Sequence, residues 1–551
     1  MPITPTYPGV YIDELPSAVR TIVGVPTSTA AFLGTAPRGA VDKPVHITSW
    51  EDYEQEFGGL DAGTDLAYAV YQFYANGGSE AEIVRVVRKD GTPLPAVVDA
   101  AAVAGAAPDA APAPETAAVL AVAASITLAG GVKLFAASPG IWANDNTLRA
   151  RVDYDTALDP DNKLYNLTIR DAKTGVTEQY LNVSKDRAAS RALKNVLASS
   201  SLIGSAEGDD QRPAAHADVT DGSDPFPDDQ KGQNLYTAAS GGLDGSAPSH
   251  KDYLGDQEAK TGLYALLNAD IFNMLCLPGE PGLISGANIL TEAMAFCVER
   301  RAMLIVDPDP DWKTVAHVTA AVRHTGPVFV LNDDNAKNAA LYFPQIVLPD
   351  VNQENAPRKF PPCGVLAGIW ARTDVQRGVW KAPAGTEATL SGVTDLTVPL
   401  TDKQNGVLNP LGVNCLRGLP VVGNVVWGAR TQRGADVLAN QWKYLPVRRL
   451  ALYLEESLYR GTQWVVFEPN DEPLWSSIRL NVGAFMNTLF RQGAFQGRTP
   501  KEAYVVKCDA TNNPQNDIDR GIVNILVGFA PLKPAEFVLI HIQQLAGAIQ
   551  V

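Results

Sequence analysis

The apolar residues between 271 and 348 alternate between helical and strand-like spacing, and this alternation restricts the fold more than any other feature of the chain. Strand-like runs occupy 272–277, 303–306, 328–331 and 342–348, and helical patterns occupy 289–297 and 312–323. Strands that alternate with helices are typical of a parallel sheet with helices on its faces. We therefore predict a mixed α/β fold built on a mostly parallel, helix-covered sheet.

The segments on both sides of this region predict further elements. Thr64 precedes apolar residues at helical spacing up to Tyr74, and a strand-like run follows at 83–87. Pro446 begins another helical pattern, which ends at Gly461. The remaining predictions are a strand at 464–467, a helix over 474–489 capped by Asn470, and strands at 504–508, 522–529 and 537–542.

A chain of 551 residues is too long for one hydrophobic core, since cores stop growing at roughly 250 to 300 residues. Alanine and proline dominate residues 96–124, and β-like runs follow at 164–170 and 177–181. We therefore predict an inserted, β-rich outer domain. The predicted divisions are an extended N-terminal arm at 1–26, a first part of the core domain at 27–90, the outer domain at 91–250, the α/β core domain at 251–375, a C-terminal domain at 376–521 and a C-terminal strand arm at 522–551.

The net charge and the cysteines restrict the partners and the compartment. A formal charge of −16 argues against nucleic acid as a partner, because phosphate backbones are bound by clustered Lys and Arg. Five scattered cysteines without CxxC spacing favour a reducing cytoplasm over a disulfide framework or a zinc site. No signal peptide is visible, and the longest uncharged stretch, 116–132, is too weakly hydrophobic to span a membrane.

Motifs that would carry catalysis are weak throughout the chain. The loop at 277–287 follows a predicted strand and precedes a helix, but it has neither GxGxxG nor a Gly-Lys-Ser/Thr ending. Asp307, Asp309 and Asp311 favour a rigid turn over a calcium site, and 509–517 favours a polar hairpin loop over an EF-hand. We predict no catalytic, cofactor-binding or metal-binding residue. An α/β enzyme with a nucleotide or sugar phosphate at 277–287 stays open as the alternative.

One basic concentration stands out in this acidic chain. It comprises Arg430, Arg433, Lys443, Arg448 and Arg449. Such a cluster can be a solvated helix face with a few ion pairs, or it can be an electrostatic contact surface for a partner. The sequence alone leaves both interpretations open.

Several motifs, in order along the chain, give it a family resemblance. They are Pro8-Gly-Val-Tyr-Ile-Asp-Glu14, Thr27-Ser-Thr-Ala-Ala-Phe-Leu-Gly34, Phe57-Gly-Gly59, Ser138-Pro-Gly-Ile-Trp-Ala-Asn144, Gly378-Val-Trp-Lys-Ala-Pro383, Leu408-Asn-Pro-Leu-Gly-Val-Asn414, Trp427-Gly-Ala-Arg-Thr431, Asn470 with Trp475, and Gly528-Phe-Ala-Pro-Leu-Lys-Pro-Ala-Glu-Phe537 with Val538. With them the chain resembles contractile tail sheath proteins of phages and of phage-like extracellular injection systems. The resemblance leaves out 91–137 and 182–250, where the family is itself variable.

The resemblance implies a structural subunit and not an enzyme. Such subunits form a metastable helical sleeve of stacked rings around an inner tube, and contraction drives the tube through a target envelope. The implied partners are further copies of the chain, the inner tube, the baseplate and the tail-terminator or cap proteins, without nucleic acid or membrane insertion. Assembly in the bacterial or host cytoplasm, as part of a phage tail or tail-like particle, is implied as well.

Site residues follow from the same resemblance. Arms from both termini join a sheet on neighbouring subunits, and the C-terminal domain faces the tube. The arm contacts expected on this basis are Val10, Tyr11, Ile12, Ile22, Val23, Phe537, Val538, Leu539 and Ile540. The expected tube contact is the helix 471–491 or the cluster Arg430, Arg433, Arg448 and Arg449. Two arms on one chain disfavour a type VI secretion sheath, and a surface-layer or adhesin-like protein is disfavoured by the missing export signal.

Overall fold

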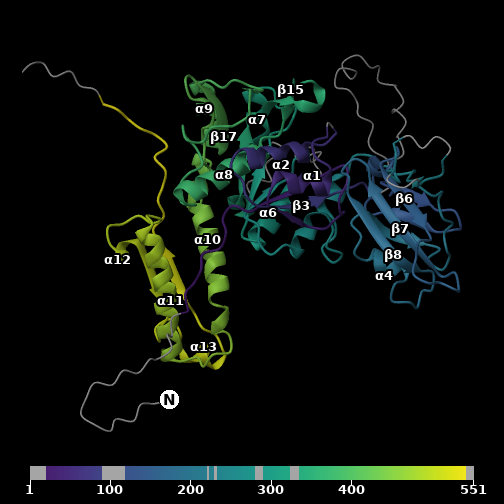
Figure 1. Cartoon of the computed structure of the whole chain (residues 1–551). Coiled ribbons are helices and arrows are strands. Elements are labelled where there is room, and N and C mark those ends of the chain that lie inside the picture. The colour runs from purple at the N-terminus through teal and green to yellow at the C-terminus, as the bar shows by residue number, and fades with distance from the viewer. Residues whose placement is uncertain are drawn as a thin grey trace, which may run out of the picture.

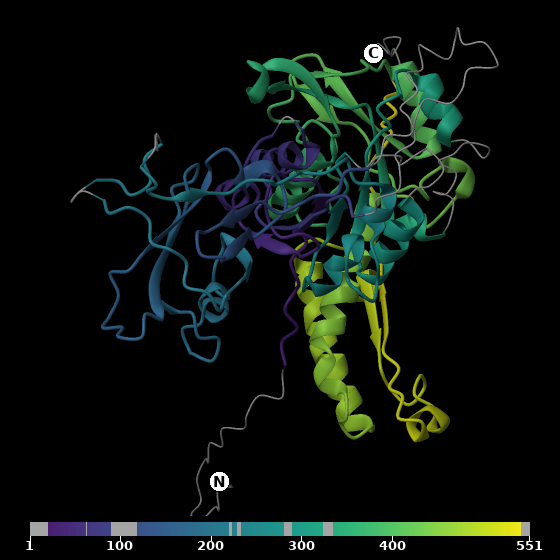
Figure 2. The same cartoon turned by 90° about the vertical axis from the view of Figure 1, so that its right-hand side faces the viewer.

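The computed structural model describes residues 20–61, 63–89, 118–219, 223–228, 233–279, 289–322 and 334–541. An α/β core occupies the centre of the molecule, a β-rich unit lies beside it, and an elongated helical unit projects from it (Figure 1). In the orthogonal view the helical unit again projects below the core, away from the β-rich unit (Figure 2).

The core is built on an eight-stranded sheet with the order β18-β17-β13-β12-β11-β1-β3-β2. Its strands are β1 Ala30–Gly34, β2 Val45–Ile47, β3 Ala81–Arg85, β11 Met274–Cys276, β12 Met303–Val306, β13 Ala339–Phe343, β17 Val413–Leu419 and β18 Gly423–Val426. The six inner strands are parallel to their neighbours, whereas the edge strands β2 and β18 pair antiparallel. The prediction of a mostly parallel sheet is confirmed.

Helices cover both faces of this sheet, as predicted. One face carries α1 Trp50–Phe57, α2 Asp65–Ala75 and α8 Cys363–Arg377, and the other carries α6 Leu290–Glu299 and α7 Val315–Val322. Helices α2 and α8 pack closely because Gly364 and Gly368 face α2, where a Cβ atom would lie 2.1 Å from Ala69 O or 2.5 Å from Phe73 O. Larger residues at these two positions would push the helices apart.

One predicted strand of the core is wrong, and another cannot be compared. The run 342–348 is not one strand, because Pro344 lacks an N–H donor and separates β13 from β14 Ile346–Asp350. β14 pairs antiparallel with β15 Ala356–Phe360 and β16 Asp395–Leu396 in a small separate sheet. The predicted strand at 328–331 lies outside the described residues.

The β-rich unit contains two small sheets around one apolar core. Its strands are β4 Ser125–Thr127, β5 Lys133–Ala136, β6 Leu148–Asp153, β7 Leu164–Asp171, β8 Thr177–Ser184, β9 Ile203–Glu207 and β10 Thr237–Ala238, with α4 Leu193–Leu197 packed on them. The strands predicted at 164–170 and 177–181 are confirmed as β7 and β8.

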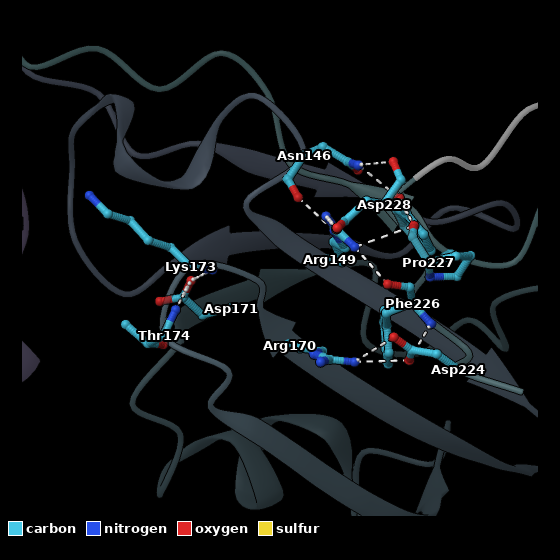
Figure 3. Close-up of polar contacts among 11 residues, drawn as sticks. Asn146, Arg149, Arg170, Asp171, Lys173, Thr174, Asp224, Phe226, Pro227 and Asp228 are labelled. Atoms are coloured by element: carbon cyan, nitrogen blue, oxygen red, sulfur yellow. Dashed lines mark hydrogen bonds and ion pairs between the residues drawn. The ribbon is translucent and has the colours of Figure 1, made fainter.

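Arginines fasten an irregular segment, 223–228, to this unit (Figure 3). Arg149 on β6 donates to the carbonyl oxygen of Phe226 at 2.7 Å and pairs with Asp228 at 2.9 Å, and Arg170 on β7 pairs with Asp224 at 2.9 Å. Arg149 donates to the carbonyl oxygens of Phe226 and Pro227. Because side chains satisfy these backbone groups, the segment needs no strand partner there.

Two further arginines join the β-rich unit to the core. Arg38 Nη1 lies 2.9 Å from Asp171 Oδ2 at the end of β7, and the Asp171 side chain is buried. Arg85 on β3 donates to the carbonyl oxygens of Pro37 and Pro139, one from each unit. Such buried, multiply bonded charges fix the two units against each other.

The helical unit contains α10 Leu445–Gly461 and α11 Glu472–Arg491, which pack along each other in one apolar cluster. The short elements α12 Pro500–Ala503, β19 Tyr504–Lys507, α13 Gln515–Asp519 and β20 Leu526–Phe529 complete it. The two long helices are confirmed. The predicted strand at 464–467 is wrong, because residues 463–465 form a 3-10 turn, and the cap of α11 is Asp471, whereas Asn470 bonds Trp475 Nε1.

Candidate inter-subunit interface

The two strands β19 and β20 form a sheet of their own in the helical unit. They pair antiparallel from Tyr504 opposite Phe529 to Lys507 opposite Leu526. Within the described residues no third strand joins this hairpin. One face packs on the apolar cluster of α10 and α11, and the side chains of Val505 and Leu526 are about half exposed. A two-stranded sheet with two free edges can accept further strands.

Four consecutive apolar residues near the C-terminal end lie on the surface. Phe537, Val538, Leu539 and Ile540 are 70–81% exposed. The strand predicted at 537–542 is not formed over 537–541, and 542 lies outside the described residues. A strand needs a neighbour, and the described part of the chain offers none here. The last described residues run past the core and then outward (Figure 1).

The N-terminal segment enters along the helical unit. Ile22 is 6% exposed and packs between α10 and α11, whereas Val23 is 77% exposed. The backbone N–H of Arg20 donates to Asn481 Oδ1 at 2.9 Å. Ile22 is therefore buried within its own chain, contrary to its prediction as a contact to a neighbour. Val10, Tyr11 and Ile12 lie outside the described residues.

Three arginines of the basic cluster are buried and do not form the contact surface that was one interpretation of the sequence. The side chains of Arg430, Arg448 and Arg449 are 0%, 6% and 3% exposed. Arg449 forms two hydrogen bonds with Asp374 of α8, and Arg448 donates to Asn338. A buried arginine needs such partners, and these partners lie too far along the chain to be recognised in the sequence. Arg433 is only partly buried and keeps its place as a candidate.

Arg430 joins the C-terminal segment to the core. Its guanidinium group donates to both carboxylate oxygens of Glu536, at 2.7 and 2.8 Å, and lies 3.0 Å from Asp436. Asn414 on β17 holds the backbone of Arg430 from the other side, since its amide accepts from Arg430 N and donates to Arg430 O. The hydrogen bonds to Arg430 hold the pKa of Glu536 below its usual range against the effect of burial.

A cleft of about 920 Å³ lies between the core and the helical unit. Trp380, Trp427 and Tyr444 contribute to its wall, and residues 532–537 pass along it. This cleft therefore adjoins the place where the C-terminal segment leaves the subunit.

The described residues contain neither a group of three His, Cys, Asp or Glu placed to hold a metal ion nor a helix long and apolar enough to cross a membrane. Asp307 is buried and accepts from the backbone N–H of Cys363, whereas Asp309 accepts from the N–H of Asp311, so these carboxylates do not converge. Of the loop at 277–287, only Leu277 to Gly279 belong to the described residues.

Two family models match the chain. The phage tail sheath protein central domain matches residues 252–432, and the phage tail sheath C-terminal domain matches residues 439–544. Together they cover about half of the chain.

Curated relatives agree with these matches. The tail sheath protein of Vibrio phage KVP40 is 29% identical over 185 residues, which are 33% of this chain and 26% of the relative. The tail sheath protein of Burkholderia phage BcepMu is 27% identical over 263 residues, which are 46% of this chain and 52% of the relative. The matches thus span about a quarter and about half of the length of these relatives.

Solved structures share the fold over nearly the whole chain. The contracted helical sheath of the anti-feeding prophage has a TM-score of 0.54 at 19% identity, with 98% of this chain and 100% of that chain covered. A sheath tail protein of Listeria innocua has a TM-score of 0.55 at 14% identity, with 93% and 96% covered. On the family matches and the curated relatives, the chain belongs to the contractile tail sheath family.

Proposed function

We propose that the chain is the structural subunit of a contractile tail sheath, which polymerises as a helical sleeve around an inner tube and contracts to drive that tube through a target envelope. The observation that carries this proposal is the hairpin β19–β20, which no third strand joins in the described part of the chain, together with exposed apolar residues at 537–540. A surface strand edge and an unpaired apolar segment are hazards for a monomer but useful in a polymer.

In this proposal the arms of neighbouring subunits complete the hairpin sheet. Residues 537–540 of one neighbour and 10–12 of another supply strands, whose backbone groups pair with the edges of β19 and β20. Backbone pairing of this kind depends little on side chains and tolerates rotation of the units around it. Subunits thus stay connected while their surfaces exchange one set of contacts for another.

The energy for contraction then comes from the difference in contact free energy between two lattices of the same subunit. No nucleotide is needed at the moment of contraction. A trigger at the baseplate frees the first ring, and each ring that contracts displaces the contacts of the next. Assembly takes place in the cytoplasm, and a cap protein ends the sheath.

The contact with the inner tube needs a surface other than the buried arginines. The outer face of α11 presents Ser476, Leu480, Ala484 and Thr488 to solvent at regular helical spacing. We assign the tube contact to this face, with Arg433 as a second candidate. An Ala484→Glu variant that still assembles around the tube would contradict the assignment to α11.

Electron microscopy of the purified chain, alone and with the tube protein encoded beside it, tests the function directly. Hollow tubes of stacked rings support it, whereas monomers or small closed rings in both samples contradict it.

Deletion of residues 1–19 removes one arm but leaves the contacts of Arg20 and Ile22. This variant is expected to be a folded monomer that forms no tubes, and unfolding would count against the strand-exchange account.

A further inference from the structure

We propose that Glu536 fastens the C-terminal arm to the core of its own subunit, so that the arm is free to reach a neighbour only from Phe537 onward. The inference rests on the proposed function, because it concerns how the arm links subunits. It assigns Glu536 and Arg430 a positioning role in assembly.

The carboxylate of Glu536 is held by several donors at once. Arg430 Nε and Nη2 donate at 2.7 and 2.8 Å, Asn409 Nδ2 donates at 2.8 Å, and Tyr444 Oη donates at 3.2 Å. The Arg430 side chain is 0% exposed, and that of Glu536 is 18% exposed. A bidentate, charge-assisted pair at such low exposure is among the strongest polar contacts a protein makes.

The burial of the Arg430 guanidinium group keeps this contact in place. Without Glu536 the buried guanidinium group would keep Asp436 as its acidic partner, and Asp436 is about half exposed and also pairs with Lys443. Because Asp436 is partly exposed and shared with Lys443, removing Glu536 leaves the charge of the buried guanidinium group only partly compensated. Glu536 therefore stays bound whenever the subunit is folded, in either lattice.

The chain is fastened on both sides of the cleft. The backbone N–H of Ala530 donates to Ala503 O in the helical unit, and Glu536 binds Arg430 at the core. Between them, Leu532, Lys533 and Ala535 are exposed and pass along the 920 Å³ cleft. The arm thus starts from the core and not from the hairpin, although the hairpin is only a few residues away in sequence.

Tension in the arm is then transmitted directly to the eight-stranded sheet of the core. From Glu536 it passes to Arg430, and from the backbone of Arg430 to Asn414 on β17 through two hydrogen bonds. A release at Glu536 would lengthen the free part of the arm by the six residues 531–536, which correspond to about 20 Å.

We call the contact of Glu536 with Arg430 the clamp, and a nitroxide label tests it in the monomer. All five native cysteines are buried, so Ala535→Cys gives one accessible thiol beside Glu536. In the labelled Ala535→Cys protein we expect the spectrum of an immobilised label. Adding Glu536→Gln is expected to give the spectrum of a label that moves on the nanosecond scale. Lys533→Ala, an exposed neighbour on the same segment, is the matched control and should leave the spectrum unchanged. A spectrum that E536Q does not change overturns the clamp.

Assembly of the same variants, without the label, tests the consequence. E536Q is expected to form fewer and shorter tubes than the wild type or K533A at equal protein concentration. Normal tubes from E536Q would overturn the positioning role even if the label becomes mobile. If E536Q does not fold, Tyr444→Phe removes one donor from Glu536 and must give the same changes in weaker form. A wild type without tubes would contradict the proposed function, while the label still decides the clamp.

Discussion

Asp307 follows β12 directly, where its buried carboxylate accepts from the backbone N–H of Cys363 at the start of α8. Burial raises the pKa of this carboxyl group to about 7, although hydrogen bonds from Cys363 act in the opposite direction. In an unfolded chain the pKa of Asp is about 3.9. Because the folded pKa is the higher one, the stability that this group contributes is lost as the pH rises from about 4 through 7.

Asp307→Asn keeps an acceptor for Cys363 but cannot ionise. We expect the unfolding free energy of the wild type to fall by about 2 kcal/mol relative to the variant between about pH 5.5 and 7. Urea titrations of both proteins at several pH values measure this difference. Two stability curves that run parallel across this range would show that the carboxyl group keeps an ordinary pKa in the fold.

The pair Arg449 and Asp374 is the residue-scale contact that the sequence could not reveal. With both side chains at most 3% exposed, Arg449→Ala leaves a buried carboxylate without its partner and is expected to lower the unfolding free energy by about 3–5 kcal/mol. Arg377→Ala breaks the exposed pair with Glu387 and should cost about 1 kcal/mol or less. Equal losses in thermal or urea unfolding would contradict the structural role of Arg449.

At the scale of elements, regular patterns were predictable and partners were not. The apolar spacing after Pro446 predicts α10 nearly to the residue, because packing on one face sets the period of the helix. The same pattern cannot show that Arg448 and Arg449 point inward, since Asn338 and Asp374 come from distant segments. The strand predicted at 464–467 was wrong for a related reason: Val465 and Val466 favour strands, but no strand among the described residues lies beside them.

The root of the N-terminal arm gives a prediction about α10 and α11. A Cβ atom at Gly461 would lie 2.5 Å from Ile22 Cγ2, so Gly461→Ala must displace Ile22 from its groove. We expect trypsin to cut after Arg20 faster in this variant than in the wild type. Gly483→Ala on α11 is the matched control, because nothing lies within 4 Å of the added atom. The Gly483→Ala variant should leave cleavage unchanged and raise the unfolding free energy by up to about 1 kcal/mol. Unchanged cleavage in G461A would show that Ile22 does not hold the arm.

For the whole molecule, the net charge of −16 acts against association. Each ring brings many like-charged copies together, and their repulsion extends over about 30 Å at 0.01 M salt but only about 3 Å at 1 M. In the proposed sheath the arms, in contrast, join through apolar residues such as Phe537 and Leu539 and through backbone pairing, which salt screens little. Assembly should therefore proceed at lower protein concentration as salt rises.

Light scattering of the purified chain across salt concentrations measures this dependence. A threshold concentration that falls with added salt fits a polymer held by apolar contacts and strand pairing against a repulsive background. A threshold that rises with salt would mean that ion pairs between subunits dominate the lattice, and the free energy of contraction would then lie in charged contacts that differ between its two states. Because the clamp of Arg430 and Glu536 is buried within one subunit, salt should leave the label at residue 535 immobile in both cases, so that the two effects can be separated.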